Sequence, residues 1–227
     1  MLLKKLIASK SLDAALFYGL QVDESITWMK TKGVNSSTHP RAIDLGCGDG
    51  YFGHGLETNG HTVTYLDYNK FISPDVGLTP IKFIQFDLAK DDFTTLGTYD
   101  LVVLSNTLEH LPDPQQTLAN VTKLLNSGGI LYLCWTNWLS PYGGHEFTPY
   151  HYLGSKMASW LYKVLPEKLL VDGRQPRHIL NQTLFPTYIG QTLKWLKAIR
   201  GLSHFFSLFF MSIRPSVCPD RFFFRAQ

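Results

Sequence analysis

The stretch "DLGCGDGYFG", residues 44–53, decides the fold, because it joins the end of an apolar run to a turn rich in glycine. The apolar run, residues 41–45, predicts a buried β-strand. Glycines at positions 46, 48 and 50 let the backbone turn sharply and approach a ligand without interference from side chains. A helical pattern follows and stops at Gly60. The stretch therefore predicts a strand, a ligand-binding turn and a helix.

Downstream of this turn, short apolar runs alternate with helical patterns, which is typical of parallel βαβ units. Further strands are predicted at residues 61–67, 81–87, 99–105 and 129–135. The run at 99–105 is apolar almost throughout, as expected for a strand covered by helices on both faces. We therefore predict an α/β, doubly wound, Rossmann-like sheet, whose ligand lies beyond the carboxyl ends of the strands.

Three aspartates at strand ends indicate the class of ligand. Asp44 would repel the pyrophosphate of a dinucleotide but attract a cationic group, and S-adenosylmethionine carries an ammonium and a sulfonium without phosphate. Asp67 ends the second strand, where a carboxylate can accept hydrogen bonds from both ribose hydroxyls. Asp87 ends the third, where it can accept from an adenine amine. The structural alternatives are that Asp44 satisfies backbone donors at a helix start and that Asp87 caps a helix, whereas Asp67 has few structural duties at its position.

These motifs, followed by "YDLVVLSNTLEHLPDP" (99–114) and "LLNSGGILYL" (124–133), resemble the class I S-adenosylmethionine-dependent methyltransferases, and most closely their ubiquinone and menaquinone biosynthesis branch. The resemblance covers roughly residues 38–135. It implies a seven-stranded sheet whose last strand, within residues 218–227, is antiparallel. The glycines then surround the methionine part of the cofactor, and Ser105 and Asn106 lie beneath the sulfonium. The full set of implied cofactor residues is Asp44, Gly46, Cys47, Gly48, Gly50, Asp67, Tyr68, Asp87, Leu88, Ser105 and Asn106.

The segment "NTLEHLPDP" raises the question of a metal. In membrane-associated quinone O-methyltransferases a related segment supplies two glutamates and a histidine to a divalent ion, and Glu109 and His110 match two of these positions. Asn106 replaces the other glutamate, and an amide is a poorer ligand than a carboxylate for a hard dication. We therefore predict no metal there and expect His110 to lie beside the cofactor or to position the substrate.

The loop "WTNWLSPYGGHEFTPYHYLG", residues 135–154, begins where the fifth strand ends, on the methyl-accepting side of the predicted site. Transfer to a hydroxyl or an amine requires alignment and removal of a proton, for which histidine is suited near neutral pH. His145 is the favoured base and His110 the second candidate. The predicted acceptor pocket is lined by Trp138, Tyr142, Glu146 and Tyr150. Alternatively, the aromatic residues pack the loop onto the domain and His145 caps a turn; a carbon acceptor would need no base.

One domain of 227 residues is expected, with N-terminal helices (1–38), a cofactor-binding core (39–135), a substrate loop with a helical substrate-cap insertion (136–213) and a C-terminal strand (214–227). Residues 156–225 hold eleven Lys and Arg but three acidic residues, whereas the whole chain carries +3. This low net charge argues against a nucleic-acid partner. The basic region with "HFFSLFFMSI" (204–213) fits a peripheral contact with an anionic membrane, and burial in a core is the plainer alternative.

The N-terminal run "MLLKKLIASK" is too short for a secretory signal, and no apolar segment approaches the roughly 20 residues that span a bilayer. We expect a cytoplasmic protein, peripheral at the membrane in the alternative above, whose oligomeric state the sequence leaves open. The predicted function is S-adenosylmethionine-dependent methyl transfer to a small lipophilic or aromatic metabolite, on oxygen. The alternatives are an NAD-dependent oxidoreductase, which Asp44 disfavours, and a cofactor-binding module without catalysis.

Overall fold

A computed structural model of the chain describes residues 14–74, 76, 81–141, 143–166, 178–199, 202–205 and 220–226, and the structural statements below concern these residues. Within them, no helix is both long and apolar enough to cross a membrane. The predicted segment 204–213 lies outside the described residues except for its first two positions.

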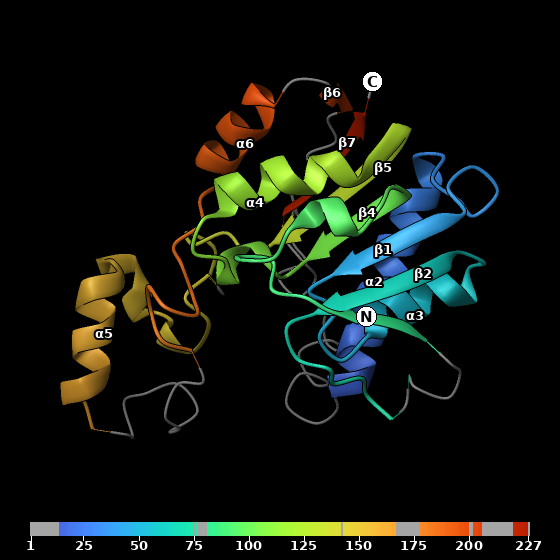
Figure 1. The fold of residues 1–227 in the computed structure, drawn as a ribbon. Coiled ribbons are helices and arrows are strands. Elements are labelled where there is room, and N and C mark those ends of the chain that lie inside the picture. Colours follow the sequence, from blue (N-terminus) through green and yellow to red (C-terminus); the bar gives the residue numbers. More distant parts are fainter. Residues whose placement is uncertain are drawn as a thin grey trace.

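The strands form one twisted sheet in the order β3-β2-β1-β4-β5-β7-β6 (Figure 1). Strands β1 to β5 pair in parallel, and β7 is antiparallel to both β5 and β6. The α/β class and the antiparallel last strand are therefore confirmed. The strands are β1 (Arg41–Leu45), β2 (Thr62–Asp67), β3 (Lys82–Gln85), β4 (Tyr99–Ser105), β5 (Leu125–Trp135), β6 (Leu202–Phe205) and β7 (Asp220–Ala226).

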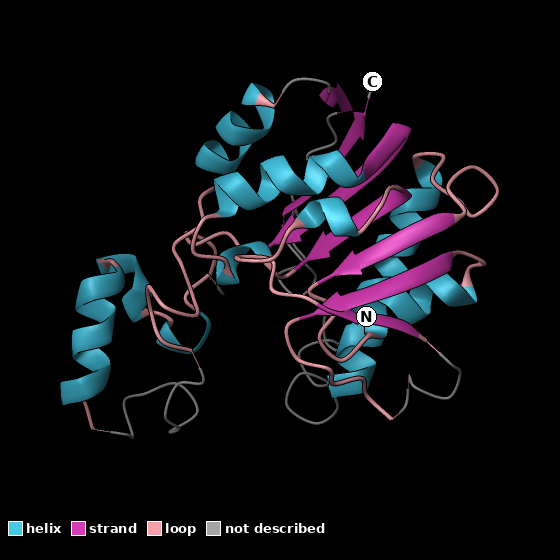
Figure 2. Cartoon of the chain, viewed as in Figure 1, coloured by secondary structure: helices cyan, strands magenta, loops and turns pink. Residues whose placement is uncertain are grey.

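Helices cover both faces of the sheet (Figure 2). On one face, α2 and α3 contribute Val22, Ile26 and Leu56 to a buried cluster, while α4 and α6 contribute Leu118 and Leu196 to the cluster on the other face. The helices are α2 (Ala14–Thr31), α3 (Tyr51–Thr58), α4 (Pro114–Val121), α5 (Ser155–Val164) and α6 (Ile189–Ala198), and the 3-10 turns are η1 (Phe93–Thr95), η2 (Leu108–His110), η3 (Thr122–Leu124), η4 (His145–Phe147) and η5 (Tyr150–Leu153).

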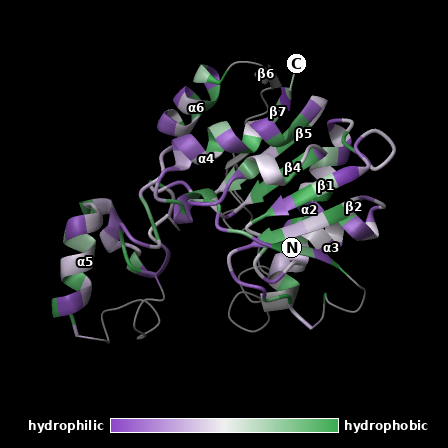
Figure 3. Cartoon of the chain, in the orientation of Figure 1, coloured by the Kyte–Doolittle hydropathy of each residue, from purple (hydrophilic) through white to green (hydrophobic). Residues whose placement is uncertain are grey.

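The side chains of strand β4 are buried on both faces of the sheet. Leu101 and Val103 point into one cluster and Val102 and Leu104 into the other, and all four are fully buried. Successive side chains of a strand face opposite sides, so an unbroken apolar run suits a strand with helices on both faces. The hydrophobic colouring of the central strands in Figure 3 follows from this position.

A third buried cluster lies outside the sheet layers. It consists of Trp138, Phe147, Ala158, Tyr162, Leu180 and Leu184. Residues 138–166 and 178–184, here called the outer module, therefore have a small core of their own, and α5 stands away from the sheet (Figure 1). Residues 136–213 were expected to form a substrate loop and cap insertion, but within this range α6 is different, because Leu196 is buried with α4 against the sheet. The apolar face of α6 is satisfied there, so this helix is part of the α/β layers.

Candidate active site

The glycine turn joins β1 to α3 at the carboxyl edge of the sheet. Gly46 has φ 69°, a left-handed conformation that disfavours other residues, and a Cβ there would lie 2.5 Å from the Thr107 side chain. Thr107 itself contacts the carbonyl oxygens of Leu45 and Ser105 through its hydroxyl, at 3.3 and 3.1 Å. The turn and the loop after β4 are therefore packed against each other, and only glycine fits at position 46.

Asp67, at the end of β2, stabilises the glycine turn through a hydrogen bond. Its Oδ2 accepts a hydrogen bond from the Gly48 amide at 2.9 Å, and its Oδ1 accepts from the Asn69 amide at 3.0 Å. The expectation that Asp67 has few structural duties is therefore wrong. Each carboxylate oxygen offers a second lone pair, so the half-buried group still has acceptor capacity. The neighbouring Tyr68 is largely exposed.

Asp44 lies at the end of β1 and is 2% exposed. Its Oδ2 accepts from the Gly53 amide at 2.9 Å in the first turn of α3, as the structural alternative proposed. Burial raises the pKa of Asp44 to about 7. The carboxyl also lines the pocket described next. Asp44 thus has one structural hydrogen bond and, in addition, a charge that depends on pH near neutrality.

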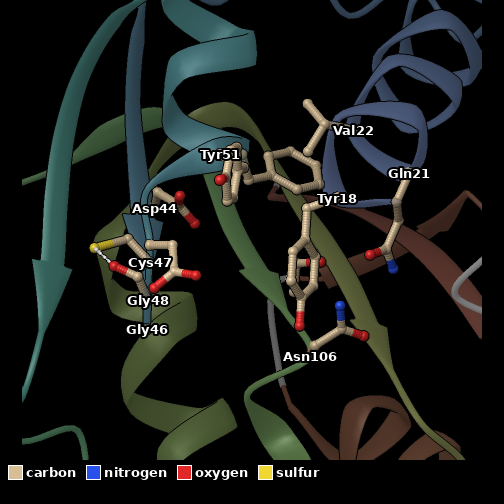
Figure 4. A pocket seen from close by; sticks show the side chains of 12 residues that line it. Tyr18, Gln21, Val22, Asp44, Gly46, Cys47, Gly48, Tyr51 and Asn106 are labelled. Carbon is tan, nitrogen blue, oxygen red and sulfur yellow. Dashed lines mark hydrogen bonds between the residues drawn. The ribbon is translucent and has the colours of Figure 1, made fainter. Parts of the chain in front are cut away.

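A pocket of about 280 Å³ lies between the glycine turn, α2 and the end of β4 (Figure 4). Of the predicted cofactor residues it brings together Asp44, Gly46, Cys47, Gly48, Ser105 and Asn106. Its other lining residues are Tyr18, Gln21, Val22, Asp49, Tyr51 and Phe52, which sequence reasoning missed. Tyr18 stacks on Tyr51 with ring centroids 5.8 Å apart and extends toward Asn106 in Figure 4. The helix before the first strand therefore closes one side of the pocket.

The remaining predicted cofactor residues lie outside this pocket. Asp87 Oδ1 accepts from the Ala89 amide at 2.9 Å and Oδ2 pairs with Lys90 Nζ at 3.0 Å, but the residues that follow form a turn and not the helix that the capping alternative expected. Partial burial alone would raise the pKa of Asp87, but these contacts lower it below its ordinary value. Leu88 lines a second cavity of about 110 Å³ next to α4. Gly50 is the N-cap of α3, with φ 85°.

The loop after β4 carries Asn106, Glu109 and His110. Asn106 has φ 53°, in the left-handed region, and its amide donates to the Cys134 carbonyl at 2.9 Å. Glu109 is 1% exposed; its Oε1 accepts from the Thr136 amide at 3.0 Å, and its main-chain oxygen accepts from Phe185 at 2.7 Å. This segment, which was predicted to lie beside the cofactor, therefore also anchors the chain that enters and leaves the outer module.

Three histidine rings meet beside this loop. His178 lies 4.9 Å from His110 and 5.0 Å from His145 between ring centroids, and His110 and His145 lie 5.4 Å apart. All three are partly buried. The two histidines chosen from the sequence are thus neighbours, whereas His178 was missed, because nothing in its local sequence marks it. We call these three residues the histidine cluster.

Glu146 orients one member of the cluster. Its Oε1 and Oε2 lie 3.1 and 2.9 Å from His178 Nδ1. Partial burial would raise the pKa of Glu146, but the hydrogen bond with His178 and the charges nearby lower it to about 2. Glu146 is therefore ionised at neutral pH. Its hydrogen-bond partner, His178, lies 32 positions further along the chain.

The aromatic residues of the 135–154 loop are mainly structural. Trp138 is 2% exposed and belongs to the core of the outer module. Tyr150 packs on Tyr162 with ring centroids 6.2 Å apart, and Tyr142 lies outside the described residues. The expectation that Trp138 lines an open acceptor pocket is therefore wrong, because its ring is used to pack the module. Glu146 and the histidine cluster remain as polar groups at this edge.

Comparisons with known proteins agree with this geometry. A family model described as "Methyltransferase domain" matches residues 43–131. An uncharacterized methyltransferase of Mycobacterium marinum is 28% identical over 194 residues, covering 81% of this chain and 72% of the relative. Magnesium protoporphyrin IX methyltransferase from Synechocystis PCC 6803 with bound SAH has a TM-score of 0.60 at 16% identity, over 93% of this chain and 84% of that one. The plantazolicin methyltransferase in complex with SAH gives 0.56 at 12%, over 99% and 90%. At these identities the two structures show a shared fold.

Proposed function

We propose that this chain, an S-adenosylmethionine-dependent methyltransferase with the class I α/β fold, methylates an oxygen atom of a small lipophilic or aromatic acceptor at the histidine cluster. The family match spans the strands that carry the glycine turn, from β1 into β5. The observation that carries the proposal is the pocket between this turn and Asn106, with the buried Asp44 in its wall. A buried carboxylate beside a glycine turn suits a ligand that brings a positive charge.

The cofactor is placed along the carboxyl edge of the sheet. Its methionine part occupies the pocket, with the ammonium toward Asp44 and the sulfonium above Ser105 and Asn106. The ribose lies at Asp67, whose oxygens have lone pairs beyond those used by Gly48 and Asn69. The adenine extends toward Asp87 and Leu88. These placements, and the closer relationship to quinone biosynthesis enzymes, are predictions from the sequence motifs.

We place the acceptor at the histidine cluster, where the outer module meets the loop after β4. This placement is based on the loop after β4, in which His110 follows the pocket residue Asn106 by four positions. His145 takes the proton from the acceptor hydroxyl, with His110 as the second candidate. The outer module then acts as the cap that keeps water from the transferring methyl group.

Calorimetric titration of the purified chain tests the cofactor assignment. S-Adenosylhomocysteine should bind with one site per chain, and NADH should not bind, because its pyrophosphate would meet the Asp44 carboxylate. Binding of NADH alone would contradict the methyltransferase assignment. An acceptor screen with phenols and hydroxylated lipids, using labelled cofactor, then tests transfer to oxygen.

Asp44 should make cofactor binding depend on pH. Its pKa is raised to about 7, so the carboxyl is mainly neutral at pH 6 and mainly ionised at pH 8. Only the ionised form attracts the cofactor ammonium, and binding near pH 7 therefore releases a proton. We expect the affinity for S-adenosylhomocysteine to rise about tenfold from pH 6 to pH 8, as measured by calorimetry. The Asp44→Asn variant should bind more weakly at pH 8 with no such rise; a flat profile in the unmodified chain would place the ammonium elsewhere.

The outer module also supplies a surface for a lipophilic acceptor. Trp160 is 56% exposed on α5, one turn from the exposed Lys156 and Lys163, and the other exposed apolar residues nearby are Tyr152, Leu153, Met157 and Val164. Aromatic and basic residues on one helix are typical of contact with an anionic membrane. We propose that this surface rests on a membrane from which the acceptor is taken.

Flotation with vesicles containing anionic lipid measures this contact. Trp160→Ala should lower the fraction of protein recovered with the vesicles at least about fivefold, because burial of an aromatic side chain contributes about 2 kcal/mol. The matched control is Phe71→Ala, which removes another aromatic residue, 60% exposed and remote in sequence from α5. An equal loss in both variants, or no recovery of the unmodified chain, would contradict the contact.

A further inference from the structure

The histidine cluster has the arrangement of a ligand set. Among the described residues, His110, His145 and His178 each offer one ligand nitrogen within 4.8 Å of the other two. A tetrahedral zinc ion with Zn–N bonds of about 2.0–2.1 Å would place such nitrogens roughly 3.3 Å apart. Binding of one ion therefore requires the rings to rotate until their nitrogens are closer than in this structure, by up to about 1.5 Å.

The second ring nitrogens indicate which atoms face the centre. His110 Nδ1 lies 2.7 Å from the Thr183 carbonyl oxygen, and His178 Nδ1 lies 2.9 Å from Glu146 Oε2. Both partners only accept, so each Nδ1 carries the proton that it donates and Nε2 is the ring nitrogen left to bind an ion. Histidines that bind metals commonly donate their other N–H to a carbonyl or a carboxylate in this way. Two of the three rings thus have the supporting contacts of metal ligands before an ion is present.

We propose that His110, His145 and His178 bind a first-row divalent transition metal ion such as Zn²⁺, with a fourth position open to the acceptor's oxygen. Imidazole nitrogen favours Zn²⁺, Co²⁺ or Ni²⁺ over Mg²⁺ and Ca²⁺, which prefer oxygen. Three protein ligands with one open position are typical of catalytic zinc sites. This set differs from the one considered from the sequence, because Asn106 and Glu109 are not part of it and two ligands come from the outer module.

Ion binding would have two consequences. It would fix the outer module to the α/β layers, because His110 follows β4 whereas His145 and His178 belong to the module. It would also lower the pKa of a coordinated hydroxyl, so the acceptor could lose its proton to solvent while His145 serves as a ligand. The open position rests on the proposed function, but the binding of the ion does not.

Titration with Zn²⁺ after removal of metal by a chelator tests the site, on a chain without a histidine tag. We expect one ion per chain, and with Co²⁺ the visible absorption of a tetrahedral site. His178→Ala and His145→Asn should each lower Zn²⁺ affinity at least about 100-fold, and Glu146→Gln about 10- to 100-fold. The matched control is His54→Gln on α3, which should change nothing. S-Adenosylhomocysteine binding, in a pocket that these residues do not line, reports folding of every variant.

The outcomes separate the two proposals. Absence of Zn²⁺ binding, or binding that is unchanged in the His178→Ala and His145→Asn double variant, would overturn the metal site. Ion binding at the cluster without transfer to any hydroxyl acceptor would leave the metal site standing and contradict O-methylation. Transfer that depends on His145 and proceeds after chelation, without a bound ion, would support the proposed function and overturn the proposed open position for the acceptor's oxygen.

Discussion

Exchange of His145 for asparagine should lower the turnover number for a hydroxyl acceptor by about 10²- to 10⁴-fold, the range that a positioned proton acceptor contributes. The affinity for S-adenosylhomocysteine should not change, because His145 does not line the cofactor pocket. Asparagine is the suitable replacement, since His145 has φ 47° and asparagine tolerates the left-handed region better than alanine does. The same decrease in turnover number is expected if the imidazole accepts the proton and if it binds an ion that promotes release of the proton.

Single-turnover assays with labelled cofactor measure this effect, with His54→Gln as the control. The two histidine variants should bind the cofactor equally well, so a difference in rate reports the acceptor side alone. An unchanged rate in His145→Asn would contradict transfer to oxygen at this cluster and would favour a carbon acceptor, for which no base is required.

Gly46→Ala should abolish most cofactor binding, with a loss of S-adenosylhomocysteine affinity of at least about 100-fold. The alanine would be in the left-handed region, which costs about 1–2 kcal/mol. Its Cβ would also lie 2.5 Å from Thr107 Cγ2 and 2.6 Å from Oγ1. Since the Thr107 hydroxyl contacts three main-chain oxygens, this side chain cannot turn away freely, and the glycine turn must shift out of the pocket wall.

Two further variants separate the causes of this loss. Gly97→Ala also has a positive φ, 75°, but no atom lies within 4 Å of the added Cβ, so it should cost stability without affecting cofactor binding. The double variant Gly46→Ala with Thr107→Ala removes the overlapping atoms and should recover part of the affinity. Calorimetry on the unmodified chain, Gly46→Ala, Thr107→Ala and the double variant gives the coupling energy; equal affinities for Gly46→Ala and the double variant would show that the contact with Thr107 is not the cause.

The strands were predictable because each is marked by local pattern. The bounds of β1 and β4 agree with those expected from the sequence, and β2 and β3 are shorter by one to three residues. Strand β5 begins four residues early, at Leu125, because Leu125 still pairs with Tyr99 across an irregular register. The edge strand β6 was not placed, since its pairing depends on β7, which arrives from the end of the chain.

The site was predictable only where its residues follow a strand. Asp44, the glycines and Asn106 are close to one another because parallel strands end at one edge. Tyr18 and Gln21 enter the pocket through the packing of α2 on α3, a contact that no spacing in the sequence specifies. His178 reaches the cluster because the outer module folds back on itself. Trp138 was assigned to the acceptor pocket from its residue type. In the structure its apolar ring is buried in the core of the outer module.

The backbone conformation of Asn106 restricts which residue types are tolerated at position 106. With φ 53°, the position favours glycine or asparagine, and a side chain such as glutamate would pay roughly 1 kcal/mol or more in conformational energy. A carboxylate at this position, as in the related segment of the quinone enzymes, would therefore carry this conformational cost unless a second change returned the loop after β4 to negative φ.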